Sequence, residues 1–153
     1  MERGIRPAGR RAAALLLMVS GGLVLGALGF QFLGGLVPCE MCRWQRWAHL
    51  AVIALAAVAL VRPAWWPLPL LAMVGAAGLG LWHLGVEQGW WLGPARCAAP
   101  PARSDDLWGE LMAAPLVRCD RVPWSFLGLS MAGWNLAVSA MAAGVAAFLG
   151  RRG

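Results

Sequence analysis

Charged residues are absent from four long stretches of the chain, and these stretches are rich in leucine, alanine and valine. The four stretches are residues 12–39, 47–61, 63–86 and 122–150. A helix that spans a lipid bilayer needs about 20 apolar residues. The second stretch reaches this length only when its helix starts near Cys42 and includes Arg43 and Arg46. We therefore predict four membrane-spanning helices, near 12–33, 42–61, 68–87 and 127–150, with a long loop at about 88–126.

The composition supports a membrane protein. Hydrophobic residues make up 60% of the chain and charged residues 13%, whereas about 25% of the residues in a soluble protein are charged. The first helix could instead be a signal peptide, but it is longer than the apolar core of such a peptide and no A-x-A-like cleavage site follows it. The expected fold class is an all-α membrane protein, with a four-transmembrane-helix bundle as a single integral domain over residues 1–153.

Arginine positions predict the orientation in the membrane. Arginines precede the first helix, separate the second helix from the third and follow the fourth, at positions 3, 6, 10, 11, 62, 151 and 152. An even number of spans puts all of these on one side, which should be cytoplasmic because cytoplasmic loops are rich in arginine and lysine. Both termini are then cytoplasmic and the long loop is periplasmic. The net charge of +6 reflects this topology, so we expect no nucleic-acid partner.

Four cysteines lie on the outer side of this topology, where disulfides form and persist. Cys39 and Cys42 make a C-x-x-C motif, and this local pair leaves Cys97 and Cys119 to pair within the long loop. The loop pair could be a structural staple. A structural zinc site needs further ligands at suitable spacing, which the sequence lacks, so no metal is expected.

The C-x-x-C motif has features of a redox dithiol. Pro38 precedes it, and Cys42 is expected near the N-terminus of the second helix, where unpaired backbone N–H groups favour an anion. Arg43 and Arg46 add positive charge, and each factor raises the thiolate fraction. Arg46 lies one turn deeper, beside an apolar run, where a charged residue indicates a functional site. A quinone is one lipid-soluble electron acceptor that such a site would suit.

With these motifs in view, the chain resembles the disulfide bond formation protein B (DsbB) family of bacterial inner-membrane oxidoreductases. The resemblance covers most of the chain. It rests on FQ at 30–31, P-C-x-x-C at 38–42, Arg46, the loop cysteines Cys97 and Cys119, and Cys119-Asp120 followed by WSFLGLSMAGWN at 124–135.

The resemblance implies a protein-dithiol:quinone oxidoreductase. A periplasmic thioredoxin-like protein of the DsbA type would give electrons to the Cys97–Cys119 disulfide, with Cys97 forming the mixed disulfide. Electrons would then pass to Cys39 and Cys42, and from there to ubiquinone or menaquinone. Cys42 matches the cysteine that contacts the quinone, and Arg46 the arginine beside it.

Other assignments are weaker. Gln31 is predicted to line the quinone site, although it could instead make an interhelical hydrogen bond. His83 could reach the quinone headgroup. His49 is a lesser candidate, and Asn135 is expected to serve packing. Residues 104–112 fit a short amphipathic helix on the membrane surface or an ordinary loop helix.

Three other interpretations compete with a general thiol oxidase. The vitamin K epoxide reductases also combine four helices, C-x-x-C and a quinone, but their C-x-x-C usually lies late in the chain. A DsbB-like paralogue could serve one dedicated client. A non-catalytic scaffold with two structural disulfides would leave Arg46 without a role.

Overall fold

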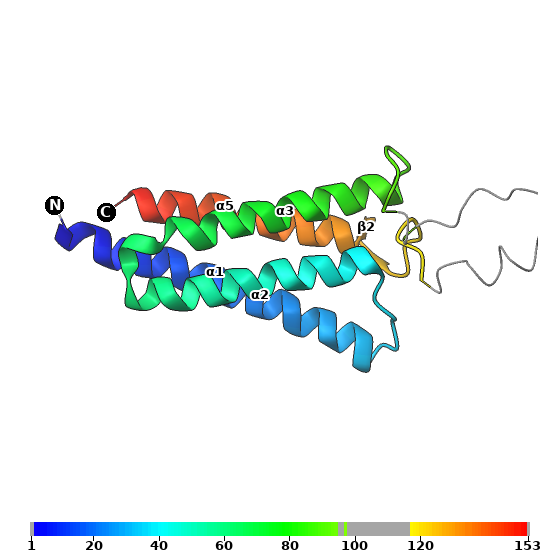
Figure 1. Cartoon of the computed structure of the whole chain (residues 1–153), viewed down its shortest axis with the longest axis horizontal. Helices are drawn as coiled ribbons and strands as arrows, with labels where there is room; N and C mark the ends of the chain where they lie inside the picture. Colours follow the sequence, from blue (N-terminus) through cyan, green and yellow to red (C-terminus); the bar gives the residue numbers. More distant parts are fainter. Residues whose placement is uncertain (1, 95–96, 98–116, 153) are drawn as a thin grey trace, which may run out of the picture.

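Four long helices lie side by side in the computed structural model, which describes residues 2–94, 97 and 117–152 (Figure 1). They are α1 (Glu2–Phe32), α2 (Glu40–Val61), α3 (Pro67–Glu87) and α5 (Met131–Arg151), and the 3-10 helix η1 (Pro63–Trp65) joins α2 to α3. Each of the four is long and apolar enough to cross a membrane. The predicted four-helix membrane bundle is therefore confirmed. The helix predicted at 104–112 lies outside the described residues.

The helices form a ring in which α1 and α3 each pack against both α2 and α5. The buried centre is built from Leu16, Val52, Met73 and several alanines, and small side chains of this kind let membrane helices approach closely. Gly80 of α3 marks one such approach, because a Cβ atom there would lie 3.0 Å from the backbone nitrogen of Leu136 on α5. The large apolar side chains on the outside of the ring suit a lipid environment.

Two predicted helix starts are wrong, and a third differs by two residues. The first helix begins at Glu2, ten residues before the predicted start, and the second begins at Glu40. The fourth begins at Met131, because Ser125–Phe126 (β1) and Leu129–Ser130 (β2) pair as an antiparallel hairpin. Leu127 and Gly128 both have positive φ, 52° and 79°, as a two-residue type I′ turn requires. The Ser130 hydroxyl then caps α5 by accepting a hydrogen bond from the N–H of Gly133 at 3.1 Å.

The two termini lie at the same end of the bundle (Figure 1). Arg10 near the start of α1 donates its Nε hydrogen to the carbonyl of Leu60 near the end of α2 at 3.1 Å. The arginines at positions 10, 62, 151 and 152 are thus gathered at one end. The C-x-x-C motif and both loop cysteines lie at the other.

Candidate redox site

The C-x-x-C motif forms the first turn of α2. Cys39 is the N-cap residue, and its Sγ accepts a hydrogen bond from the backbone N–H of Cys42 at 3.2 Å. We predicted Cys42 near the N-terminus of this helix, and Cys42 is the third residue of α2, although the helix starts two residues earlier than expected. Cys39 precedes the first helical residue. The sulfur at the helix N-terminus is therefore that of Cys39, where the positive end of the helix dipole favours negative charge.

Cys39 and Cys42 are present as free cysteines. Their Sγ atoms lie 2.7 Å apart, with the Cys39 thiol donating toward Cys42. This hydrogen bond, together with burial, raises the pKa of the Cys39 thiol above its usual value. The structure thus describes the two cysteines as a dithiol with adjacent sulfur atoms.

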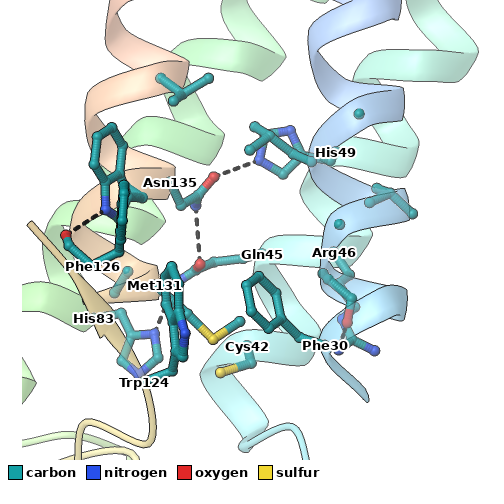
Figure 2. A pocket seen from close by; sticks show the side chains of 18 residues that line it. Phe30, Cys42, Gln45, Arg46, His49, His83, Trp124, Phe126, Met131 and Asn135 are labelled. Atoms are coloured by element: carbon teal, nitrogen blue, oxygen red, sulfur yellow. Dashed lines mark hydrogen bonds between the residues drawn. The ribbon is translucent and has the colours of Figure 1, made fainter. Parts of the chain in front are cut away.

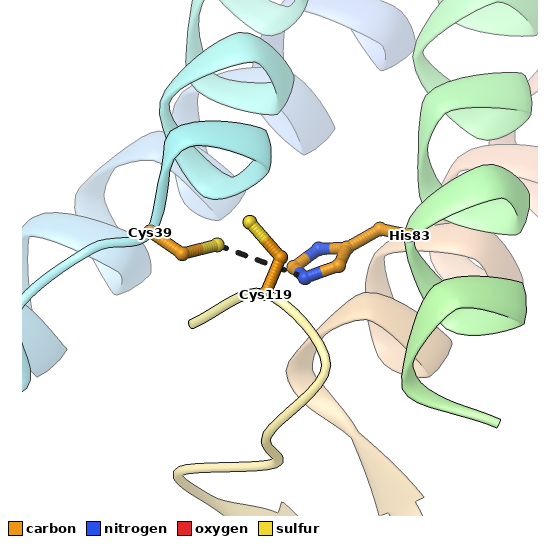
Figure 3. Close-up of side chains that lie close together, drawn as sticks. All are labelled: Cys39, His83 and Cys119. Atoms are coloured by element: carbon orange, nitrogen blue, oxygen red, sulfur yellow. Dashed lines mark hydrogen bonds between the residues drawn. The ribbon is translucent and has the colours of Figure 1, made fainter. Parts of the chain in front are cut away.

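The loop cysteines Cys97 and Cys119 are joined by a disulfide, as predicted. Both are fully buried, and the N–H of Cys119 donates to the carbonyl of Cys97 at 2.9 Å. The Cys119 Sγ, the Cys39 Sγ and a ring nitrogen of His83 all lie within 4.8 Å of one another (Figure 3). Cysteines from the loop and from α2 thus meet in one buried cluster, to which Met41 and Val86 also belong. This proximity is the geometry that sulfur exchange between the two pairs requires.

These three residues could also suggest a metal site, because each offers one ligand atom. The Cys119 sulfur, however, is bonded to Cys97 in this state, and a metal ligand must be a thiolate. The arrangement is therefore better described as two cysteine pairs poised for exchange.

Arg46 is held by α1. One of its terminal nitrogens donates to the side-chain oxygen of Gln31, and the other donates to the carbonyl of Ala27 at 3.1 Å. Its Nε is buried and has no hydrogen-bond partner among the described residues. Of the two roles considered for Gln31, the structure shows the interhelical hydrogen bond, which is made to Arg46, and Gln31 is not among the residues that line the cavity described below.

A cavity of about 400 Å³ opens between the helices beside this arginine (Figure 2). Its walls are mainly apolar and include Phe30, Trp124 and Phe126, while Cys42 and Arg46 provide polar groups. Ligand sites commonly combine an apolar cavity of roughly 300–1,000 Å³ with a few polar groups. The exposed glycines of α1 at positions 22 and 26 also line it, and a Cβ atom at either would meet no other group within 4 Å.

A chain of buried polar side chains forms one wall of the cavity. His83 Nδ1 lies 2.9 Å from Gln45 Nε2, and the Gln45 oxygen accepts from Asn135 at 3.0 Å. Asn135 in turn contacts His49 at 2.7 Å, and His49 contacts Ser20 of α1 at 3.2 Å. The chain therefore joins all four helices.

Three members of this chain were not predicted as site residues, and Ser20 is one of them. Gln45 was not singled out, and Asn135 was assigned to packing alone. Gln45 and His49 are four residues apart on α2, so the spacing of polar residues within an apolar run could have revealed this face. His83 lines the cavity as predicted, but it also contacts Cys39 at 3.6 Å.

Comparison with known proteins shows the family to which this chain belongs. The family model described as disulfide bond formation protein DsbB matches residues 9–149. Disulfide bond formation protein B of Shewanella frigidimarina is 34% identical over 80% of this chain and 78% of the relative. That of Methylococcus capsulatus is 34% identical over 85% and 87%, and that of Verminephrobacter eiseniae is 32% identical over 82% and 77%. The chain therefore belongs to the DsbB family of membrane proteins, whose members form disulfide bonds.

Proposed function

We propose that this protein is a quinone-dependent thiol oxidase of the bacterial inner membrane, which reoxidises a periplasmic thioredoxin-like protein of the DsbA type. One observation carries the proposal. The C-x-x-C pair lies between two redox partners, because Cys39 faces the loop disulfide at Cys119 and Cys42 faces the apolar cavity beside Arg46.

Electrons would enter through the loop disulfide. A thiolate of the partner protein attacks Cys97, and the sulfur of Cys119 leaves. The second thiol of the partner then displaces Cys97, so the partner is oxidised and the two loop cysteines are reduced. The assignment of Cys97 as the point of attack rests on the resemblance to the family.

The second step is internal exchange. The Cys119 thiolate attacks Cys39 of the Cys39–Cys42 disulfide, and Cys42 leaves as a thiolate. Cys97 then attacks Cys119, which restores the loop disulfide and releases Cys39. The products are a loop disulfide and a C-x-x-C dithiol, and these are the states in which the four cysteines lie here.

The cavity suits a quinone ring. A bound ubiquinone or menaquinone would supply a two-electron acceptor that can take the electron pair held by Cys42. Arg46 would hold the quinone oxygen, because its side chain lines the cavity beside Cys42. The exposed glycines Gly22 and Gly26 would leave room for entry from the lipid.

Orientation follows from the arginines. The end of the bundle that carries both termini and Arg62 would face the cytoplasm under the positive-inside rule. The cysteine end would then face the periplasm, where a dithiol partner is available. The opposite orientation would expose the cysteines to a reducing compartment.

The experiment is a turnover assay with the purified full-length protein in mild detergent. A reduced thioredoxin-like protein of the DsbA type and a short-chain quinone are added, and thiol loss and quinone absorbance are followed together. We expect equal amounts of partner disulfide and reduced quinone, and no turnover after Cys97→Ser. Oxidation of the partner without quinone reduction, or no oxidation at all, would refute the proposal. A non-catalytic scaffold with two structural disulfides predicts no oxidation of the partner at all.

A further inference from the structure

His83 is placed at the junction of the two cysteine pairs. Its side chain is 4% exposed, and its Nε2 lies 3.6 Å from the Sγ of Cys39 (Figure 3). The sulfur of Cys119 is within 4.8 Å of both groups. The imidazole is therefore beside the sulfur atoms between which the disulfide must move.

The hydrogen-bond chain determines which nitrogen of His83 carries the proton. The oxygen of Asn135 is fixed by two donors, His49 Nε2 at 2.7 Å and Ser139 Oγ at 3.2 Å. The nitrogen of Asn135 therefore donates to Gln45 Oε1, which turns the Gln45 nitrogen toward His83 Nδ1 (Figure 2). Nδ1 of His83 must accept this hydrogen bond, so the hydrogen of the neutral imidazole is on Nε2.

The Nε2 hydrogen then points at Cys39. The same sulfur accepts the backbone N–H of Cys42 at 3.2 Å, so two donors converge on one atom. The backbone of Cys119 also lies against the ring and offers a carbonyl acceptor. Glu87 is a further group near Nε2, with a carboxylate oxygen 3.9 Å away. This carboxylate oxygen is farther from Nε2 than the Cys39 sulfur is, and the second oxygen of Glu87 accepts a hydrogen bond from the hydroxyl of Ser130.

We infer that His83 is a catalytic residue of the internal exchange, which stabilises negative charge on Cys39 through its Nε2 hydrogen. In the exchange, Cys97 attacks Cys119, the Cys97–Cys119 bond forms, and the Cys39–Cys119 bond breaks. The electron pair of the broken bond stays on Cys39, where His83 and the N–H of Cys42 receive it. The total number of disulfide bonds does not change in this step.

The role of His83 in turnover rests on the proposed function, in which electrons pass from the loop cysteines to Cys39 and Cys42 and then to a quinone; we call this sequence the relay. We infer this role in place of the predicted role of His83 as a quinone ligand. Both ring nitrogens are already engaged, Nδ1 by Gln45 and Nε2 by Cys39. The ring borders the cavity but has no free donor to offer a ligand there. A quinone oxygen would have to compete with the thiol for the same hydrogen.

Two substitutions separate this role from a structural one. His83→Gln places an amide N–H near the position of Nε2, so it keeps a donor within reach of Cys39. His83→Asn places its amide near the position of Nδ1, so it keeps the contact with Gln45 and loses the one with Cys39. Both replacements are polar and smaller than histidine, so a difference between them reports on the donor to the sulfur.

The test is a thiolate titration of the full-length chain in detergent, with Cys39 as the only cysteine after the other three are changed to serine. Thiolate absorbance near 240 nm is followed against pH, with histidine, glutamine or asparagine at position 83. Since a hydrogen bond to a charged group has a substantial effect, we expect the thiolate-to-thiol ratio at a given pH to fall about tenfold with asparagine. With glutamine at position 83, the thiolate-to-thiol ratio should stay close to that with histidine.

The same two substitutions are then made with all four cysteines present. We expect His83→Asn to lower kcat for partner oxidation about tenfold and to leave KM for quinone unchanged, while His83→Gln keeps most of the activity. Equal titration curves for the two variants would overturn the inference. So would a raised KM for quinone in both variants with an unchanged Cys39 titration.

The titration needs neither quinone nor partner, so the two proposals can fail separately. If the parent protein does not reduce quinone but the titrations differ, the relay is wrong and the hydrogen bond to Cys39 stands. If turnover is normal and the titrations are equal, the relay stands and His83 has no part in it.

Discussion

The position of Gln31 behind Arg46 gives a prediction about how the two residues act together. Arg46→Ala removes the guanidinium that lines the cavity and would hold a quinone oxygen. Hydrogen bonds that involve a charged group are worth about 1.5–3 kcal/mol, and a factor of ten corresponds to about 1.4 kcal/mol. KM for quinone should therefore rise about tenfold to hundredfold. KM for the partner protein should not change.

Gln31→Leu should have a smaller effect of the same kind. It removes one of the two anchors of the guanidinium and leaves the carbonyl of Ala27 as the other. The loss of one hydrogen bond of about 1 kcal/mol predicts roughly a fivefold rise in KM for quinone. Because Gln31 acts only by holding Arg46, the substitution should have no further effect once Arg46 is alanine.

A double-mutant cycle tests this dependence. KM for a short-chain quinone is measured for the parent protein, each single variant and the double variant, with a fixed excess of reduced partner. Leu25→Ala serves as the control, since this α1 side chain is 70% exposed and lies outside the cavity wall. Additive effects of Gln31 and Arg46 would refute the reasoning, because they would mean that Gln31 contacts the quinone by itself.

Other predictions address the cysteines, the packing and the pH dependence. Cys39→Ser should abolish quinone-dependent turnover while a thiol-labelling assay still finds the loop disulfide intact; residual turnover would remove Cys39 from the relay. Gly80→Ala should lower the stability by about 1–3 kcal/mol by overpacking, whereas Gly78→Ala, which meets no atom within 4 Å, should be neutral or stabilising; thermal unfolding in detergent compares the two. Arg118 donates hydrogen bonds to Asp120 and lowers the pKa of that carboxyl group. The small stabilisation from this partly exposed pair should be present at neutral pH and lost as the pH falls through the lowered pKa, and the pH dependence of unfolding should flatten in Asp120→Asn.

The sequence predicted those parts of the fold that depend on local composition. Apolar runs of sufficient length identify the four helices, because the bilayer fixes how long a spanning helix must be. The pairing of Cys97 with Cys119 also followed from the order of the cysteines. These predictions needed no knowledge of how the helices pack.

Helix starts were harder to predict, because they depend on single side chains. Cysteine is not among the favoured N-cap residues, so nothing marked Cys39 as the cap of α2. Leu127 is not a residue expected at positive φ, so the hairpin before α5 was read as part of the helix. In both places tertiary contacts outweigh the intrinsic preference of the residue.

The contacts of the site depend on how the helices are rotated against one another. His83 and Cys39 are 44 residues apart, and Gln45 meets Asn135 across 90 residues. Polar residues on two predicted helices do not reveal whether they face each other. For the same reason, the sequence identified Gln31 as relevant but not as the partner of Arg46.

The capping of α2 by Cys39 ties the redox state of the motif to the stability of a helix end. When the proposed exchange leaves negative charge on Cys39, its sulfur accepts the N–H of Cys42 more strongly than a sulfur within a disulfide does. The first turn of α2 is therefore most stable when the motif is reduced. A dithiol whose reduced form is stabilised belongs to a more oxidising disulfide. In the proposed relay, the start of this helix would therefore favour electron transfer from the loop cysteines to the motif, and a substitution that weakens the first turn should make the motif a poorer oxidant while both cysteines are retained.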